Sequence, residues 1–211
     1  MNTSVKLHKD FLRLLDLTRD SGRYDLGSII SAIYCKQNIL YATNGKMALR
    51  CDLLKMKIYQ REYELEDGLY EVARNYLIKN SDIEGKFPLE GINKAFDNTF
   101  TKMFKTRYAG EEINTFFDFI TTLTSQGIFI NFLEFEKQLK QLFYKGNNFV
   151  IYFIDKKKAV LIECDYVIKN QVDMIYVPIS FLIMPKVYGQ IKIKDVKYNP
   201  TEKFGIREKI G

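Results

Sequence analysis

The stretch Leu40-Tyr-Ala-Thr-Asn-Gly-Lys-Met-Ala-Leu-Arg-Cys-Asp-Leu53 places a Gly-Lys pair between two apolar runs, which indicates a tight turn between two strands. Gly-Lys pairs also occur in phosphate-binding loops, where G-x-x-x-x-G-K-[ST] separates a strand from a helix and several backbone amides converge on one phosphate. Here no glycine lies five residues before Gly45, and Met47 replaces the Ser or Thr. The residues that follow are typical of a strand. The turn is therefore interpreted as a hairpin.

Length and composition favour a soluble chain of two small domains. The 211 residues, 46% of them hydrophobic, suffice to bury a sizeable core. No apolar run approaches the roughly 18 residues of a membrane span, and residues 1–10 carry charges where a signal peptide would be apolar. We therefore expect a cytoplasmic protein without a membrane partner. The net charge of +6 permits contact with an anionic polymer without requiring it.

Residues that could carry catalysis or bind a metal are sparse. Cys35, Cys51 and Cys164 are far apart and never form a C-x-x-C pair, so buried free thiols are expected rather than disulfides or a zinc site. The only histidine is His8, which excludes a His-based triad spread along the chain. The carboxylates form no D-x-D or E-x-x-E set near a basic loop. The sequence predicts neither an enzyme nor a cofactor.

Hydrophobic periodicity predicts an α+β organisation. Spacings of three and four predict helices at 9–19, 92–105, 111–124 and 132–143. Alternating or short apolar runs predict strands at 4–7, 28–34, 39–42, 47–53, 57–63, 69–73, 76–78, 128–130, 149–154, 159–164, 174–179 and 190–197. Lys156-Lys-Lys is expected at a solvated hairpin tip, and the lysines of the last segment are expected to protect an edge strand.

Four stretches carry a family pattern: YATNGKMALRC at 41–51, EGKFPLEGI at 84–92, IFINFLEFEKQLKQL at 128–142 and VLIECDYVIKNQVDMIYVPISF at 160–181. The first, second and fourth resemble hallmark segments of the bacterial sliding clamp, the β subunit of DNA polymerase III. These are its A-T-D-G-H-R-L-A turn, its G-x-F-P-D-Y link between domains and its C-terminal V-V-M-P-M strand. The third resembles the helix before the last strand pair. The four stretches keep the family's order along the chain.

This resemblance implies a sliding-clamp fold, with helices on one face of antiparallel sheets. It implies two clamp-like domains, 1–90 and 91–185, followed by a tail, 186–211. In that family the three hallmark segments converge on a hydrophobic pocket, where polymerase, clamp loader and repair proteins insert a short peptide. Carried across by position, the pocket would consist of Thr43, Gly45, Lys46, Met47, Ala48, Pro88, Ile92, Ile175, Tyr176, Val177, Pro178 and Ile179. Lys46-Met47 stands where the family has His-Arg, and Leu89-Glu90 stands where it has Asp-Tyr.

The resemblance also implies a polymerase processivity factor that encircles duplex DNA without reading its sequence, in a bacterial or phage-infected cell. Helices that line such a ring present cations to phosphate. The candidates are Lys9, Arg13, Lys94, Lys102, Lys105, Lys137 and Lys140. Two domains per chain imply a homotrimer of phage type. The alternatives are a clamp-fold adaptor that closes no ring but recruits replication or transcription proteins, and an unrelated nucleic-acid-binding α+β protein.

Overall fold

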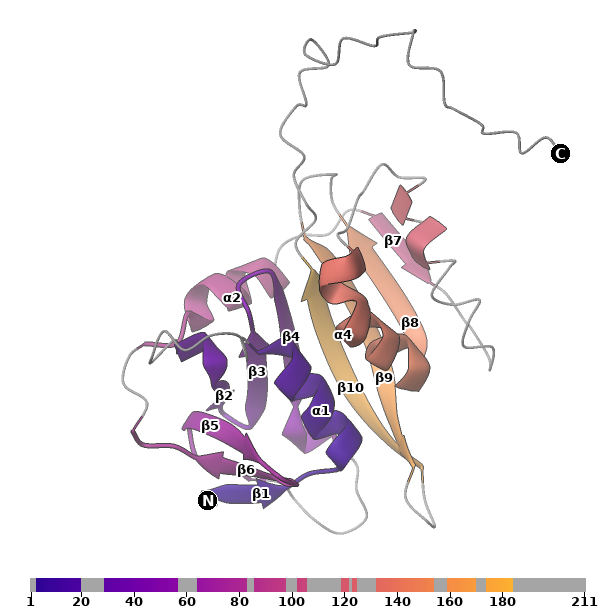
Figure 1. The fold of residues 1–211 in the computed structure, drawn as a ribbon. Helices are drawn as coiled ribbons and strands as arrows, with labels where there is room; N and C mark the ends of the chain where they lie inside the picture. Colours follow the sequence, from indigo (N-terminus) through magenta and orange to yellow (C-terminus); the bar gives the residue numbers. More distant parts are fainter. Residues whose placement is uncertain are drawn as a thin grey trace, which may run out of the picture.

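A computed structural model describes residues 3–19, 29–56, 64–82, 86–97, 102–105, 119–121, 123–124, 132–153, 159–169 and 174–183. Within these ranges the strands form one antiparallel sheet of ten, in the order β1-β6-β5-β2-β3-β4-β10-β9-β8-β7 (Figure 1). The α+β prediction is therefore confirmed. The strands expected at 57–63, 128–130 and 190–197, and the hairpin tip at Lys156, lie outside the described residues.

Most strands lie close to their expected positions. In the first half of the chain they are β1 (Ser4–Lys6), β2 (Ile33–Lys36), β3 (Ile39–Thr43), β4 (Met47–Asp52), β5 (Gly68–Ala73) and β6 (Tyr76–Lys79). In the second half they are β7 (Lys102–Lys105), β8 (Gly146–Phe153), β9 (Val160–Lys169) and β10 (Met174–Ile183). Short 3-10 turns occur at η1 (Ile29–Ser31) and η2 (Leu53–Lys55).

Alternation along β4 divides its side chains between the two faces of the sheet. Met47, Leu49 and Cys51 join the main hydrophobic core, whereas Ala48 joins a smaller cluster on the opposite face. This is the two-residue period of a strand that is covered on both sides. The sheet consequently separates two layers of packed side chains.

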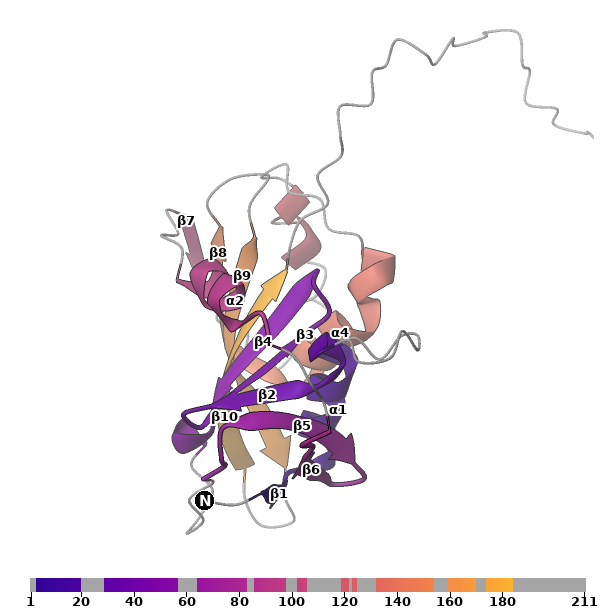
Figure 2. The ribbon, with the colours of Figure 1, turned by 90° about the vertical axis from the view of Figure 1, so that its left-hand side faces the viewer.

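Two helices cover one face of the sheet. Helix α1 (Lys9–Thr18) and helix α4 (Phe132–Lys145) pack against each other, and their apolar stripes form the main core with the strands. The side chain of Gln138 on α4 donates to the backbone oxygen of Leu17 on α1 at 2.7 Å. The shorter helix α2 (Leu89–Phe96) lies on the opposite face, as the edge-on view shows (Figure 2).

The predicted helix at 92–105 is wrong in its second half. Helix α2 ends at Phe96, and Lys102–Lys105 forms β7 instead. Met103 and Phe104 pair with Tyr152 and Ile151 of β8, so the sheet supplies backbone hydrogen bonds that the local helical spacing could not reveal. The strand expected at 28–34 begins only at Ile33, because η1 precedes it. Of the helix expected at 111–124, the described residues 119–121 and 123–124 are helical.

The two halves of the chain meet where β4 pairs with β10. The five pairs of this ladder run from Ile179 opposite Cys51 to Ile183 opposite Met47. The expected boundary between residues 90 and 91 falls within α2, and the division into 1–90, 91–185 and 186–211 stays a prediction. Among the described helices, none is long and apolar enough to cross a membrane.

Candidate functional site

The hairpin between β3 and β4 is held by its own side chains. The Thr43 hydroxyl donates to the backbone oxygen of Met47 at 2.6 Å and accepts from the N–H of Gly45 at 3.1 Å. The side-chain Oδ1 of Asn44 accepts from the backbone N–H groups of Lys46 and Met47, each at 3.0 Å. Gly45 has a φ of +81°, which favours glycine. These contacts explain how a Thr-Asn-Gly sequence closes this turn.

A pocket of about 270 Å³ lies beside this turn, between the sheet and α2. Seven of the predicted pocket residues line it together: Thr43, Gly45, Lys46, Met47, Ala48, Pro88 and Ile92. The lining is completed by Ile30, Gly91, Ala95 and Leu182. Most of these side chains are apolar, and Ile92 and Ala95 pack with Ala48, Phe96 and Leu182 into one cluster. Four segments that are separate in sequence thus form one largely apolar concavity.

The predicted wall from 175–179 is not at this pocket. Leu182 of β10 provides that wall instead, because it lies directly opposite Ala48 in the ladder between β10 and β4. Ile175 and Val177 are buried in the main core, and Tyr176 is 46% exposed further along β10. Pro178 and Ile179 border a different hollow, described below.

A sequence signal for Leu182 was present. Leu182-Ile-Met-Pro185 matches V-V-M-P of the clamp motif more closely than Val177-Pro-Ile179 does. Val177 and Leu182 are five residues apart, so the two-residue alternation of a strand places their side chains on opposite faces of the sheet. Gly91 and Ala95 could have been predicted as lining residues: they are four residues apart on α2, so they share a face with each other and with the adjacent Ile92.

The predicted DNA-facing cations are divided between the two faces of the sheet. Lys9 and Arg13 on α1, and Lys137 and Lys140 on α4, are exposed on the face where these two helices pack together. Lys140 pairs with Glu136 on its own helix. The neighbouring aspartates of α1 are also engaged, Asp10 by Lys145 and Asp16 by Arg19.

Lys9, Arg13 and Lys137 form no ion pair with any residue whose side chain the structure describes. The described part of the α1–α4 face therefore presents three exposed cations outside the ion pairs of Asp10, Asp16 and Glu136.

The remaining predicted cations lie elsewhere. Lys94 is exposed on α2, on the opposite face of the sheet, so a duplex along α1 and α4 would not contact it. Lys102 and Lys105 belong to β7 at the edge of the sheet. For these two residues the structure describes the backbone alone.

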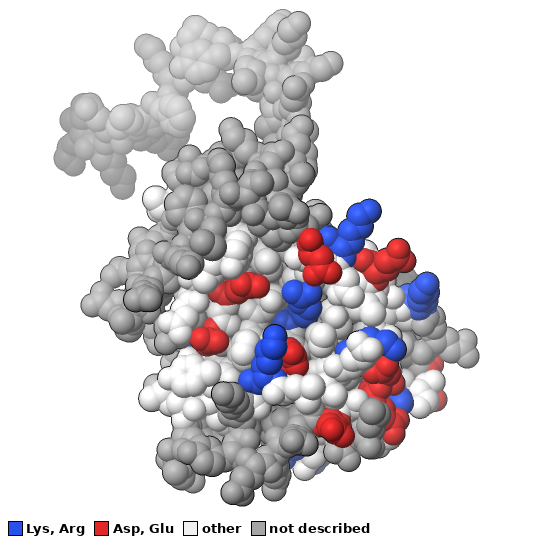
Figure 3. All heavy atoms as spheres, turned by 180° about the vertical axis from the view of Figure 1, so that it is seen from behind, with Lys and Arg blue, Asp and Glu red and all other residues white. Residues whose placement is uncertain are grey.

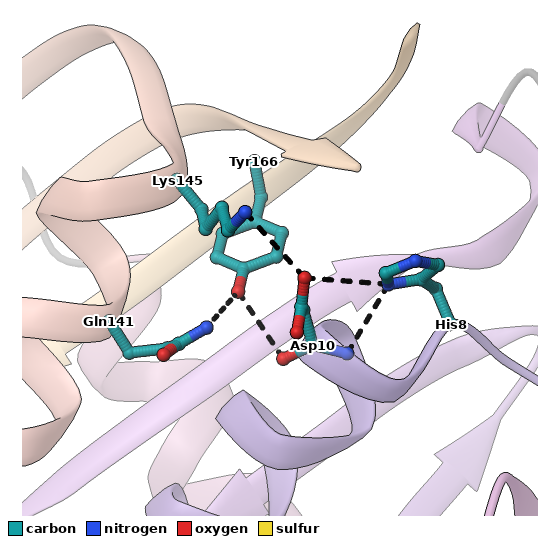
Figure 4. Close-up of polar contacts among 5 residues, drawn as sticks. All are labelled: His8, Asp10, Gln141, Lys145 and Tyr166. Atoms are coloured by element: carbon teal, nitrogen blue, oxygen red, sulfur yellow. Dashed lines mark hydrogen bonds and ion pairs between the residues drawn. The ribbon is translucent and has the colours of Figure 1, made fainter. Parts of the chain in front are cut away.

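The single histidine belongs to a polar cluster that joins the two halves of the chain (Figure 4). His8 caps α1, and its Nδ1 accepts from the N–H of Asp10 at 3.2 Å. The fully buried Tyr166 of β9 donates to the backbone oxygen of Asp10 at 3.2 Å and accepts from the Gln141 amide at 2.7 Å. Lys145 lies 3.6 Å from the Asp10 carboxylate.

Burial is the main cause of the pKa shifts in this cluster. Burial lowers the pKa of His8, although the nearby Asp10 carboxylate opposes this shift. Burial also disfavours the charged form of the Tyr166 hydroxyl and so raises its pKa. Neither a serine nor a cysteine is among these five residues. No group of three or more potential metal ligands occurs in the described part of the chain. The cluster acts as a structural junction between α1, α4 and β9.

Comparison with known proteins gives a fold but no sequence family. No protein-family model matches the sequence, and no curated protein matches it. Among solved structures, the Helicobacter pylori β clamp in complex with diflunisal is 13% identical, with a TM-score of 0.51, and the match covers 87% of this chain and 66% of that chain. The DNA polymerase III β chain of Streptococcus pneumoniae is 10% identical, with a TM-score of 0.50 and coverages of 88% and 65%.

A third solved structure matches this chain with a similar TM-score and coverage. A putative DNA polymerase III β subunit from Eubacterium rectale is 10% identical, with a TM-score of 0.50 and coverages of 89% and 66%. The chain therefore spans about two-thirds of the length of the clamps that it matches. At these identities the likeness establishes the fold alone: the chain has the sliding-clamp fold of bacterial DNA polymerase III β subunits.

Proposed function

We propose that the chain is a polymerase processivity factor of the sliding-clamp type, which docks short peptides of DNA polymerase and clamp loader in the pocket beside Gly45. The observation that carries this proposal is the pocket itself. Its lining comes from the Thr43 turn, from α2 and from Leu182 of β10, within a sliding-clamp fold. The protein acts by tethering its partners, without a chemical step or a cofactor, in the cytoplasm of a bacterial or phage-infected cell.

The chemistry of the pocket suits a short peptide with large apolar anchors. Concave apolar sites concentrate binding energy in a few fully desolvated side chains. A volume of about 270 Å³ accommodates such anchors but not a folded domain. Modest affinity suffices, because a partner that is also held near DNA binds at a high effective concentration.

Gly91 offers a direct test of peptide docking. It lines the pocket on α2, and a Cβ added there meets no atom within 4 Å. In Gly91→Leu the new side chain fills the pocket, whereas the matched control Gly91→Ala adds one methyl group. The probe is a fluorescein-labelled hexapeptide ending in Leu-Phe, with an Ala-Ala version as the reference peptide, measured by fluorescence anisotropy.

We expect Gly91→Leu to weaken binding of the Leu-Phe peptide by roughly tenfold or more, since an anchor contact contributes about 1.4 kcal/mol or more. Gly91→Ala should bind nearly as the wild type does. Equal binding by all three proteins, or equal binding of both peptides, would refute peptide docking at this pocket.

The proposed DNA contact uses the face of α1 and α4. The exposed Lys9, Arg13 and Lys137 support weak, mobile phosphate contacts without base readout. With two domains per chain, at 1–90 and 91–185, a homotrimer would supply six domains to a ring around duplex DNA. The test is retention on DNA: a ring stays on closed circles and is lost after linearisation, whereas simple electrostatic binding treats both forms alike.

A clamp-fold adaptor without a ring is the second candidate. The observation in its favour is the edge strand β1, which has only three residues and offers little backbone for pairing with another subunit. Light scattering across a range of protein concentrations distinguishes the two candidates. A stable trimer supports the ring, and a persistent monomer supports the adaptor.

A further inference from the structure

The α2-side face of the sheet is covered at one end and open at the other. Helix α2 packs over Ala48 and Leu182, but beyond it the outward side chains of β4, β10 and β9 border a second hollow of about 410 Å³. Figure 3 shows this face, on which charges of both signs lie scattered over a largely uncharged surface. This hollow is separate from the proposed peptide pocket and contains none of its lining residues.

The open half of this face combines exposed apolar groups with an excess of carboxylates. Met174 and Tyr176 of β10 are 61% and 46% exposed, and Pro178 follows them into the hollow. On the adjacent strand β9, Asp165 lies opposite Pro178 and Glu163 lies opposite Ser180. An apolar strip therefore runs beside two carboxylates that are two residues apart on one face.

The two basic residues that are described as lining the hollow are already paired. Arg50 lies 3.3 Å from Asp97 and stacks over the ring of Phe96, and Lys55 lies 3.6 Å from Asp52. Asp165 accepts a hydrogen bond from the Asn148 amide at 3.0 Å. Among the residues whose side chains are described, neither Glu163 nor Asp165 has a cationic partner. The hollow thus favours an occupant that is basic and partly apolar.

The end of this same chain has that composition. Residues 184–211 contain seven Lys or Arg and three Asp or Glu, so they carry +4 of the net charge of +6. Their most regular stretch is Gln190-Ile-Lys-Ile-Lys-Asp-Val-Lys197, in which isoleucines alternate with lysines. In composition the segment matches both features of the open face, since isoleucines suit the apolar strip and lysines suit the two carboxylates.

The connection is long enough. Strand β10 ends at Ile183, and Pro178 lies five residues back along it, about 17 Å at the rise of a strand. The six residues 184–189 span up to about 20 Å when extended, which exceeds this distance along β10. A tethered segment also needs only weak contacts, since its effective concentration is high.

We propose that residues 190–197 dock on the open sheet face at the hollow between β4, β10 and β9, held by Glu163 and Asp165 and by the apolar strip at Met174 and Tyr176. The segment is the chain's own cover for this face. The proposal is independent of the peptide pocket, so failure of either leaves the other standing.

The test is amide hydrogen exchange of the full chain, read by mass spectrometry on peptides that contain residues 191–197. Docking is expected to slow exchange there by roughly tenfold relative to the same segment as a free synthetic peptide. The charge-neutral pair Glu163→Gln and Asp165→Asn should remove this protection. Glu90→Gln, an exposed carboxylate on α2, is the matched control and should retain it.

A second variant alters the segment and leaves the folded body untouched. Lys192→Gln, Lys194→Gln and Lys197→Gln together should abolish the protection, with unchanged exchange in β9 and β4. Three results would overturn the proposal: wild-type exchange as fast as in the free peptide, protection unaffected by either set of variants, or protection that rises with protein concentration. The last result would assign the face to the tail of a second copy.

Discussion

The hydroxyl of Tyr166 is a precise probe of the junction between the two halves of the chain. Its ring is fully buried, so Tyr166→Phe removes one oxygen atom and leaves the packing of the ring intact. Two hydrogen bonds are lost, one to the backbone oxygen of Asp10 and one from the Gln141 amide. A buried neutral hydrogen bond contributes a net free energy of about 0.5–1.5 kcal/mol. Gln141 is half-buried, so its amide can regain a hydrogen bond to water after the substitution.

We therefore expect Tyr166→Phe to lower the free energy of unfolding by about 1–2 kcal/mol. For a chain of this size that corresponds to a Tm lower by roughly 2–8 °C. The assay is urea unfolding followed by far-UV circular dichroism, with the midpoint compared at constant m-value. Tyr144→Phe is the matched control, since Tyr144 lies on α4 with 56% exposure and should change stability by less than about 0.5 kcal/mol.

A double-mutant cycle isolates the contact between the two side chains. Tyr166→Phe and Gln141→Ala should be coupled by about 0.5 kcal/mol or more, because they share one hydrogen bond. Additive effects would show that the Gln141 contact is energetically silent. Equal midpoints for Tyr166→Phe and Tyr144→Phe would refute the role of the hydroxyl in joining β9 to α1.

Three further predictions concern stability, pH dependence and thiol chemistry. Gly91→Ala should raise the free energy of unfolding by about 0.5–1 kcal/mol in urea melts, because glycine is unfavourable inside a helix and the added Cβ meets no neighbour; a lower midpoint would contradict this. Burial lowers the folded pKa of His8, so the unfolded chain binds the proton more tightly and stability should fall as the pH drops below about 6.5. His8→Asn, which caps the helix without titrating, should flatten the stability profile between about pH 7 and 5.5, above the range where carboxylates protonate; an unchanged slope would exclude His8 as its origin. Burial raises the pKa of the Cys35 thiol to about 11 and raises those of Cys51 and Cys164 as well, so Ellman's reagent at about pH 8 should titrate no thiol in the folded chain and three in urea. Rapid labelling of the native protein would show that one of these strands opens readily.

The sequence predicts well those features that its neighbouring residues determine. The turn at Thr43 is readable because Thr43, Asn44 and Gly45 make its hydrogen bonds and its positive φ locally. The helix before Lys145 is readable because its apolar stripe follows the helical period. Both predictions needed no knowledge of the rest of the fold.

Features that depend on pairing between distant strands were less predictable. Residues 102–105 have helical spacing with the segment before them, yet pairing with β8 makes them a strand. Strand β10 extends over ten mostly apolar residues, from Met174 to Ile183, so its hydrophobic periodicity, unlike the Leu182-Ile-Met-Pro185 motif, does not reveal which part adjoins the Thr43 turn. The cross-strand register, with Leu182 opposite Ala48, decides that point. Register is a property of two chain segments, and a single-segment pattern does not contain it.

The ladder between β4 and β10 joins segments that are more than a hundred positions apart in the chain. The pocket beside Gly45 is lined from both of these segments, so it exists only once the two halves have come together. A nascent or partly folded chain would offer no completed docking site. Under the proposed function, capture of a client peptide would report on the maturity of the chain, and immature copies would be kept out of any assembly that depends on that capture.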